Sequence, residues 1–331
     1  MSHVAVLGAG AWGTALALCL AERGAIRLYT WDPAHAAALA AARENQRFLP
    51  GFQLPANVTA SADLGHTLDG AELVVLALPS VALRSVLEGA RSVLPAVPLV
   101  LASKGIEQGS WMLLTEVVAD VLGAEAASRT LVLSGPSFAL EVAKKLPTNL
   151  VVAAKSHDLS VAVQGRIATE RLRVYSSDDP VGVQVGGALK NVIAIAAGAC
   201  DGLGFGYNTR AALITRGLAE MARLAIAKGG KVLTLAGLAG LGDLVLTCTG
   251  ELSRNRTVGF ELGRGGRLES VLAGLGHVAE GVPTAEAAHK LAERLGVELP
   301  ISSEVYRVLF EAKPVAAAVE DVLHRPLRAE W

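Results

Sequence analysis

A lysine lies at the centre of a long apolar stretch. Lys190 is the only charged residue in the run from Val181 to Cys200, which reads VGVQVGGALKNVIAIAAGAC. Burying an ammonium group costs free energy unless partners compensate, and desolvation lowers the pKa of a lysine towards neutrality, where it can exchange protons. Lys190 is therefore a candidate acid–base residue. A lysine whose stem merely snorkels from a buried helix to water fits the same run.

A glycine turn near the N-terminus suggests what such a group would work with. The apolar run His3–Leu7 is followed by G-x-G-x-x-G, with glycines at Gly8, Gly10 and Gly13, and then by a helix-forming segment. In this motif the first glycine makes the tight turn, the second lets the backbone approach a pyrophosphate, and the third lets helix and strand pack closely. The helix N-terminus attracts the phosphates. Because a second strand is predicted at 26–31, the pattern predicts dinucleotide binding rather than a merely tight turn.

Asp32 ends that second strand, about twenty residues after the glycine turn. A carboxylate at this place usually binds the adenosine ribose 2′-OH, which favours NAD over NADP. The same residue precedes Pro33, and an aspartate followed by proline is also a typical start of a helix. The two interpretations stand side by side, so Asp32 leaves the cofactor preference open.

Composition limits the class of protein. A chain of 331 residues exceeds one comfortable core, so two domains are expected, and the net charge of −1 gives no general affinity for nucleic acid or anionic membranes. The three cysteines are an odd number and widely spaced, which indicates a reducing compartment and neither a disulfide framework nor a metal site. We expect a cytoplasmic protein with no metal. The run around Lys190 is long enough to span a membrane, but Lys190, Gln184 and Asn191 within it favour a buried helix of a soluble protein.

The predicted elements change character along the chain. Strand-like runs without polar alternation indicate a parallel sheet covered on both faces; they lie at 26–31, 73–78, 98–102, 131–133, 150–154 and 172–175. Helical stretches alternate with them, at 81–93 and 111–122 among others. After about Pro180 the periodicity is helical, as at 211–228, 282–295 and 302–311. The fold class predicted is α/β: a Rossmann-type doubly wound dinucleotide-binding domain over 1–180, then a mostly α-helical substrate and catalytic domain over 181–331.

Four further segments carry candidate chemistry. Lys104 follows a predicted strand, where strand ends face a cofactor, although a solvated loop lysine fits equally. Ser137, after another strand, could donate to an anion, but capping of the next helix is favoured. Asp243 lies in a glycine-rich run that follows no strand; it could pair with Lys190 or cap a helix. Ser253–Arg256 (SRNR) combines a hydroxyl, guanidinium groups and an amide, which suits a phosphate as well as a solvated helix start.

Together these motifs resemble a known enzyme family. In order they are Gly8–Gly13 (GAGAWG), Ala102–Gly105 (ASKG), Ser134–Ala139 (SGPSFA), Gly187–Val192 (GALKNV), Gly240–Thr247 (GLGDLVLT), Ser253–Arg256 (SRNR) and Ala279–Gly281 (AEG). The chain resembles, over essentially its whole length, the bacterial NAD(P)-dependent glycerol-3-phosphate dehydrogenases. The resemblance implies interconversion of dihydroxyacetone phosphate and sn-glycerol 3-phosphate, mainly by reduction that supplies glycerophospholipid biosynthesis. A homodimer is the common state of such enzymes.

The resemblance also implies roles for individual residues. Lys190 would be the catalytic acid–base and Asp243 would orient it and contact the substrate. The residues implied to bind substrate are Lys104, Gly135, Ser137, Lys190, Asp243, Ser253, Arg254 and Asn255. The residues implied or predicted to bind the cofactor are Gly8, Gly10, Ala11, Trp12, Gly13, Trp31, Asp32, Lys104, Ala139, Arg254, Val278 and Glu280.

Two positions depart from the family pattern. Ala11 stands where the family often has Ser or Thr, which removes one hydroxyl from the pyrophosphate site. Trp31 stands where NADPH-using members often have a basic or polar residue, and His35 or Arg27 could compensate. Family habit favours NADPH and Asp32 favours NAD, so either cofactor remains possible.

Two other functions fit part of the pattern. A ketopantoate or 6-phosphogluconate type of dehydrogenase shares the N-terminal fold and often a catalytic lysine, but it does not explain SRNR together with GLGDLVLT. A non-catalytic dinucleotide sensor would keep the Rossmann domain, but retention of Lys190, Asp243 and Arg254 argues against it.

Overall fold

The computed structural model describes residues 2–275 and 278–326. The chain forms two compact units. Unit 1 comprises Met1–Lys104 and Met112–Gln184, and unit 2 comprises Gly105–Trp111 and Val185–Trp331. The last of the three crossings between the units falls inside one long helix, α8 (Pro180–Gly202), whereas the crossings at 104–105 and 111–112 lie outside helices and strands.

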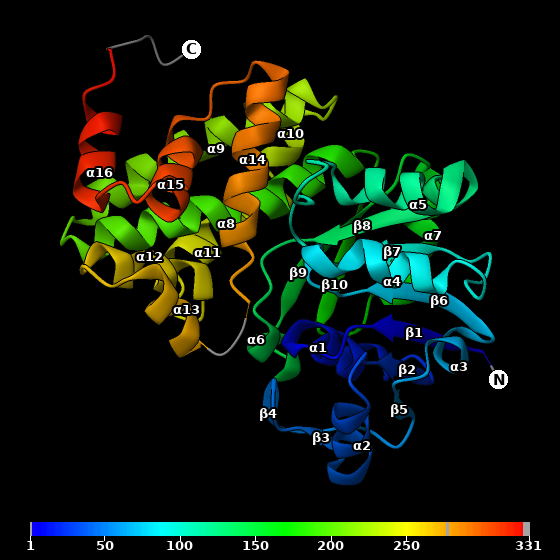
Figure 1. Ribbon diagram of the computed structural model, residues 1–331. Helices are drawn as coiled ribbons and strands as arrows, with labels where there is room; N and C mark the ends of the chain where they lie inside the picture. The colour runs from blue at the N-terminus through cyan, green and yellow to red at the C-terminus, as the bar shows by residue number, and fades with distance from the viewer. Residues whose placement is uncertain (1, 276–277, 327–331) are drawn as a thin grey trace. The chain divides into compact units, whose positions relative to one another are not determined.

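Unit 1 is built on an eight-stranded sheet with the strand order β10-β9-β8-β7-β6-β1-β2-β5 (Figure 1). The strands are β1 (His3–Leu7), β2 (Ile26–Tyr29), β5 (Val58–Ser61), β6 (Ala71–Leu76), β7 (Leu99–Leu101), β8 (Thr130–Ser134), β9 (Thr148–Ala153) and β10 (Leu172–Ser177). The order reverses at β1, which pairs with β2 on one side and β6 on the other. Such a reversal is the topological switch point of a doubly wound sheet, where ligands bind at the carboxyl ends of the strands.

Helices cover both faces of this sheet because its strands are apolar on both sides. Val6 faces a cluster that includes residues of α1 (Ala11–Leu20), α2 (Pro33–Ala42) and α7 (His157–Ile167). Ala5 and Leu7 face the opposite cluster, formed with α3 (Leu64–Leu68), α4 (Leu83–Ala90) and α5 (Leu114–Ser128). The expected Rossmann-type architecture is confirmed.

The prediction of a parallel sheet is wrong at one strand pairing. β8 and β9 pair antiparallel, so β9 and β10 run opposite to the other six strands. A parallel return would require a crossover element across the sheet. The connection from 135 to 147 instead holds the five-residue α6 (Ala139–Ala143), which packs against α1. Pattern analysis also missed β5 and the small hairpin of β3 (Glu44–Asn45) and β4 (Leu49–Gln53).

The regular secondary structure of unit 2 is helical in the residues that the structure describes, as expected. Besides α8 its helical segments are α9 (Tyr207–Ala227), α10 (Val232–Leu235), η2 (Leu238–Gly242), α11 (Asp243–Thr249), α12 (Arg254–Gly263), α13 (Leu268–Leu275), α14 (Gly281–Leu295), α15 (Pro300–Phe310) and α16 (Val315–Leu323). Glycines let α8 and α12 pack backbone to backbone: a Cβ on Gly198 would lie 1.9 Å from the Arg256 carbonyl oxygen, and one on Gly259 would lie 1.8 Å from that of Ile195. This close crossing brings the first turn of α12 to α8.

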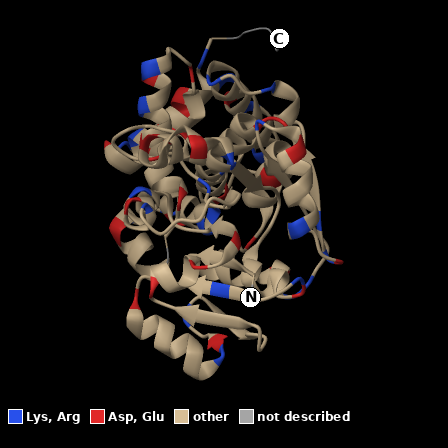
Figure 2. Ribbon diagram, turned by 90° about the vertical axis from the view of Figure 1, so that its right-hand side faces the viewer, with Lys and Arg blue, Asp and Glu red and all other residues tan. Residues whose placement is uncertain are grey.

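Among the described helices, α8 alone is long and apolar enough to cross a membrane, and its most apolar window is completely buried inside the protein. Burial of this kind is the arrangement of a core helix. Acidic and basic residues are interspersed in the view of Figure 2. That distribution agrees with the near-zero net charge of the chain.

Candidate active site

The glycine turn joins β1 to α1 with the geometry that a dinucleotide requires. Gly8 has a φ of +114°, and a Cβ there would lie 2.4 Å from the carbonyl oxygen of Ala77. A Cβ on Gly13 would lie 1.8 Å from the Gly8 carbonyl oxygen, whereas one on Gly10 would meet open space. Gly10 caps α1 without a side-chain hydrogen bond. The turn therefore leaves room at Gly10 for a phosphate at the helix N-terminus, which fits a dinucleotide.

Two side chains hold this turn against the rest of unit 1. The Trp12 indole donates to the Ala102 carbonyl oxygen at 3.2 Å, at the end of β7. The Asn45 amide donates to the Ala9 carbonyl oxygen at 2.9 Å and to Thr14 Oγ1 at 2.7 Å. Sequence analysis missed Asn45 because no local motif connects the β3–β4 hairpin with the glycine turn. Ala11 begins α1, so its backbone belongs to the same N-terminus.

Asp32 caps α2. Its Oδ1 accepts from the backbone N–H groups of Ala34 at 2.9 Å and His35 at 3.3 Å, and Pro33 opens the helix. The capping interpretation is confirmed, while binding of a ribose hydroxyl stays a prediction. Trp31, immediately before it, is 80% exposed.

Lys104 and the turn after β8 come together in unit 1. Lys104 Nζ donates to the Gly135 carbonyl oxygen at 3.1 Å, and Ser137 Oγ donates to the same oxygen at 2.9 Å. Capping by Ser137 was wrong: the cap of α6 is Phe138, with no side-chain hydrogen bond. The Ser137 hydroxyl instead bonds within the turn, to the carbonyl of Gly135 two residues earlier. Ala139 is the first residue of α6, beside α1.

In unit 2 the buried lysine has the partner expected for it. Lys190 Nζ donates to Asp243 Oδ1 at 2.7 Å, and the side chains of Lys190 and Asp243 are 9% and 1% exposed. The snorkelling interpretation of Lys190 was wrong. Asp243 is the first residue of α11, whose cap is Gly242, so it does not act as an N-cap. Burial of an ion pair is costly unless further hydrogen bonds satisfy it.

Thr247 supplies one such bond, and sequence analysis had not singled it out. Its Oγ1 accepts from Lys190 Nζ at 2.9 Å and donates to the Asp243 carbonyl oxygen at 2.6 Å. The signal that could have found it is spacing: Thr247 follows Asp243 by four residues in GLGDLVLT, which places both on one face of α11. The result is a lysine held at a defined position in a low-dielectric surrounding, which suits proton transfer.

The SRNR segment separates into residues with different tasks. Ser253 caps α12, its Oγ accepting from the Arg256 N–H at 3.2 Å. Arg254 is the first residue of α12 and part of it reaches solvent; burial of the rest lowers the pKa of its guanidinium, and the charge of Glu280 opposes that change. A cation at a helix N-terminus is unfavourable by itself. An anion bound there would be stabilised by the guanidinium and by the helix end together.

The second arginine of that segment is structural. Arg256 donates through Nε and Nη2 to Asp201 Oδ2 at 3.0 and 2.7 Å, and Arg210 donates twice to the other oxygen of Asp201. The carboxylate of Asp201 therefore joins α8, α9 and α12. These bonds assign Arg256 a structural task, and its contribution to an anion site stays a prediction.

An amide chain links three segments of unit 2. Asn191, next to Lys190, accepts from Asn255 Nδ2 at 2.9 Å, and Asn255 Oδ1 accepts from the Gly281 N–H at 2.9 Å. Asn255 thus ties α8 to the start of α14, which follows Glu280. Val278 is 48% exposed in the same segment. This chain of amide hydrogen bonds sets the positions of Lys190, Arg254 and the 278–280 segment relative to one another.

The cysteines take no part in this chemistry. All three are free and buried, and burial raises the pKa of Cys19 and Cys200 to about 11 and that of Cys248 to about 12. They are therefore neutral thiols near pH 7 rather than nucleophiles. Among residues 2–275 and 278–326 no group of three His, Cys, Asp or Glu residues could hold a metal ion.

A doubly wound sheet with a G-x-G-x-x-G turn, followed by a helical unit with a buried lysine–aspartate pair, defines the class of two-domain nicotinamide dehydrogenases. Models of the N-terminus and C-terminus of NAD-dependent glycerol-3-phosphate dehydrogenase match residues 3–160 and 179–320. The chain belongs to this family.

Similar proteins agree over the full length. The glycerol-3-phosphate dehydrogenase [NAD(P)+] of Koribacter versatilis is 48% identical, over 100% of this chain and 99% of its own. That of Nitrosomonas europaea is 50% identical over 99% of both. The crystal structure of glycerol-3-phosphate dehydrogenase from Coxiella burnetii superimposes with a TM-score of 0.93 and 41% identity, covering 98% of this chain and 99% of that one. Similarity of this extent also rules out the other dehydrogenase types considered from the sequence.

Proposed function

We propose that this enzyme interconverts dihydroxyacetone phosphate and sn-glycerol 3-phosphate by hydride transfer with NADH or NADPH. Membership of the family supports the reaction and the cofactor class. The observation that supports catalysis by this chain is the buried Lys190–Asp243 pair at 2.7 Å. A sensor that binds a dinucleotide without turnover would have no need for a buried ion pair in its second unit.

Unit 1 would hold the cofactor. The turn Gly8–Gly13 would receive the pyrophosphate at the N-terminus of α1, and Trp31 and Asp32 would lie towards the adenosine. The other residues proposed to bind the cofactor are Lys104, Ala139, Arg254, Val278 and Glu280. The bound nicotinamide would supply the hydride that is added to C2 of the ketone.

Lys190 would supply the proton. As the C2 carbonyl is reduced, negative charge develops on its oxygen, and Nζ of Lys190 would donate a proton to that oxygen to give the secondary alcohol. Asp243 and Thr247 would fix the direction of Nζ and stabilise its charge before transfer. In the oxidation direction the neutral amine would accept the same proton.

Arg254 would bind the substrate phosphate at the N-terminus of α12, with Ser253 and Asn255 beside it. Lys104, Gly135 and Ser137 are the other residues proposed to bind the substrate. Binding energy from the remote phosphate can be used to orient the reacting carbonyl. We further propose domains at 1–180 and 181–331, a cytoplasmic homodimer, and net reduction that supplies glycerophospholipid synthesis.

The test is the loss of reduced-nicotinamide absorbance with dihydroxyacetone phosphate, run in parallel with NADPH and NADH. We expect turnover with at least one of them. Binding of a cofactor without turnover would support the sensor instead.

A further inference from the structure

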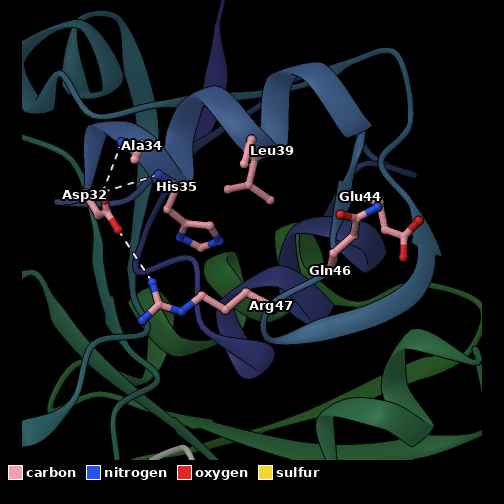
Figure 3. Close-up of a pocket in the computed structure, with 8 residues that line it drawn as sticks. Asp32, Ala34, His35, Leu39, Glu44, Gln46 and Arg47 are labelled. Carbon is pink, nitrogen blue, oxygen red and sulfur yellow. Dashed lines mark hydrogen bonds and ion pairs between the residues drawn. The ribbon is translucent and has the colours of Figure 1, made fainter.

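A pocket of about 290 Å³ lies beside Asp32, at the carboxyl end of β2 (Figure 3). Its lining includes His35 and Leu39 of α2 and Glu44 and Arg47 of the β3–β4 hairpin region. In a doubly wound dinucleotide site, the adenosine ribose lies at the end of the second strand, where a nearby arginine can accommodate a 2′-phosphate. The question is which cation of this chain could do so, since Trp31 offers none.

Arg27 is committed to the backbone. Its guanidinium donates to the carbonyl oxygens of His66 and of Asp69, the latter at 3.0 Å. Arg43 is committed in the same way, donating to the carbonyl oxygens of Val58 at 2.9 Å and Leu54 at 3.0 Å. Moving either arginine would uncover carbonyl groups that need a donor.

His35 is committed as well. It is 8% exposed, its Nδ1 lies 3.3 Å from Thr30 Oγ1, and its Nε2 lies 3.1 Å from Asn45 Oδ1. Asn45 in turn holds the glycine turn. The imidazole is therefore part of the scaffold beneath the pocket, and the expectation that His35 or Arg27 compensates for Trp31 does not fit these contacts.

Arg47 differs from these residues. Its side chain is 63% exposed, lies over the Phe48 ring at 4.9 Å from the ring centroid, and pairs with Asp32 Oδ2 at 3.5 Å. An exposed, loose ion pair of this kind contributes little to stability. Figure 3 shows the Arg47 guanidinium pointing towards Asp32.

Asp32 does not need Arg47 to keep its place. Its Oδ1 accepts both hydrogen bonds that cap α2, from the N–H groups of Ala34 and His35, while its Oδ2 forms the ion pair with Arg47. Glu44, the other carboxylate of the pocket, accepts from the Gly51 N–H at 2.7 Å and from Gln53 Nε2 at 3.2 Å. Arg47 can thus exchange partners while both carboxylates keep their structural bonds.

We propose that Arg47 is the residue that determines cofactor specificity, by leaving Asp32 to bind the 2′-phosphate of NADPH. A guanidinium binds phosphate bidentately. The doubly charged 2′-phosphate therefore competes well with the single oxygen of Asp32, Oδ2, for the Arg47 guanidinium. With NADH, Arg47 stays on Asp32, whose charge it neutralises beside the ribose. The chain therefore accepts both cofactors and prefers the 2′-phosphorylated one. This inference rests on the proposed function, since it assumes a dinucleotide on the glycine turn.

The test is binding of adenosine 2′,5′-bisphosphate and of AMP to the full chain, measured by calorimetry without turnover. We expect wild type to prefer the bisphosphate, and Arg47→Gln to lower this preference by about 10–100-fold, the effect of losing charge-assisted hydrogen bonds. Arg47→Lys should restore part of it. Asp32→Asn keeps an oxygen for the cap and removes the competing charge, so it should tighten bisphosphate binding by about 2–5-fold.

The matched control is Arg171→Gln. Arg171 is 53% exposed and has a similar loose ion pair, to Glu170 at 3.6 Å, on the other edge of the sheet. Arg171→Gln should leave the preference for the bisphosphate over AMP unchanged. Equal binding of both probes by wild type, or an equal loss of both in Arg47→Gln, would overturn the role of Arg47. If neither probe nor any nicotinamide dinucleotide binds wild type, the proposed function itself is wrong.

Discussion

The two units build their candidate sites by different physical means. Unit 1 shapes its candidate phosphate position from backbone: Gly8 and Gly13 allow close backbone packing that a Cβ would prevent, and Gly10 leaves open space. Unit 2 builds from side chains that lie far apart in sequence, since Lys190 and Asp243 are separated by 53 residues. A site built from backbone therefore tolerates substitutions of the side chains around it, but it does not tolerate a Cβ on one of its glycines. A side-chain site fails when a single functional group is removed.

The largest effect is expected in unit 2, from Lys190→Ala. General acid catalysis contributes about 10²–10⁴-fold, so kcat should fall by that factor while cofactor affinity changes little. Steady-state rates and nicotinamide fluorescence titrations separate the two quantities. Because the change leaves Asp243 buried without its cation, Tm should also fall. Near-normal turnover in this variant would remove Lys190 from the mechanism and leave the side-chain site without its acid.

Next comes a pair of arginines two residues apart. Arg254→Ala should raise KM for dihydroxyacetone phosphate by about 10–100-fold with Tm nearly unchanged, because an exposed group that binds phosphate is lost. Arg256→Ala should instead lower the free energy of unfolding by about 1–3 kcal/mol, since Asp201 loses its charge-assisted bonds. Steady-state kinetics and thermal unfolding of both variants show which arginine binds substrate and which stabilises the fold. Equal KM values in Arg254→Ala and wild type would show that the phosphate binds elsewhere.

Two glycines of unit 1 provide a comparably matched pair. Gly10→Ala adds a methyl group into open space, so the chain should fold normally but bind NADH and NADPH about 10-fold more weakly, because the pyrophosphate can no longer approach. Gly13→Ala places the same group 1.8 Å from a backbone oxygen and should destabilise the fold by about 1–3 kcal/mol. Thermal unfolding and fluorescence titration distinguish them. A Gly10→Ala variant with undiminished affinity would show that the turn does not bind the pyrophosphate.

The same contrast explains how far the sequence could be interpreted. The glycine turn and the buried strands are local patterns, so the doubly wound fold and its cofactor turn were predicted. The direction of β9 was not, because a strand's own residues do not encode its orientation. Pairing of Lys190 with Asp243 was one of two open interpretations, and only tertiary contacts decided it. The partners of Arg256 and Ser137, which are Asp201 and the Gly135 carbonyl, could not be predicted for the same reason, because the fold brings them together.

The smallest effect concerns a carboxylate outside the site. Glu220 of α9 is 1% exposed and accepts from the backbone N–H groups of Ile301 and Ser302 and from the Ser302 hydroxyl, so it caps α15 from another helix. Desolvation by burial raises its pKa, and the hydrogen bonds to Ile301 and Ser302 oppose that rise only in part. A raised pKa in the folded state means that the native chain holds this proton more tightly than the unfolded chain.

The sign of the pH dependence follows from that difference. The stability linked to this proton is fully present below the unfolded-state pKa, about 4.3, and is lost as pH rises through the raised folded-state value. Glu220→Gln cannot ionise and keeps one acceptor for the cap. The free energy of unfolding of wild type relative to Glu220→Gln should therefore fall as pH rises from 4 to 8. Denaturant unfolding at several pH values measures it, and a difference that grows with pH would show that the buried carboxylate is held as an anion by its cap.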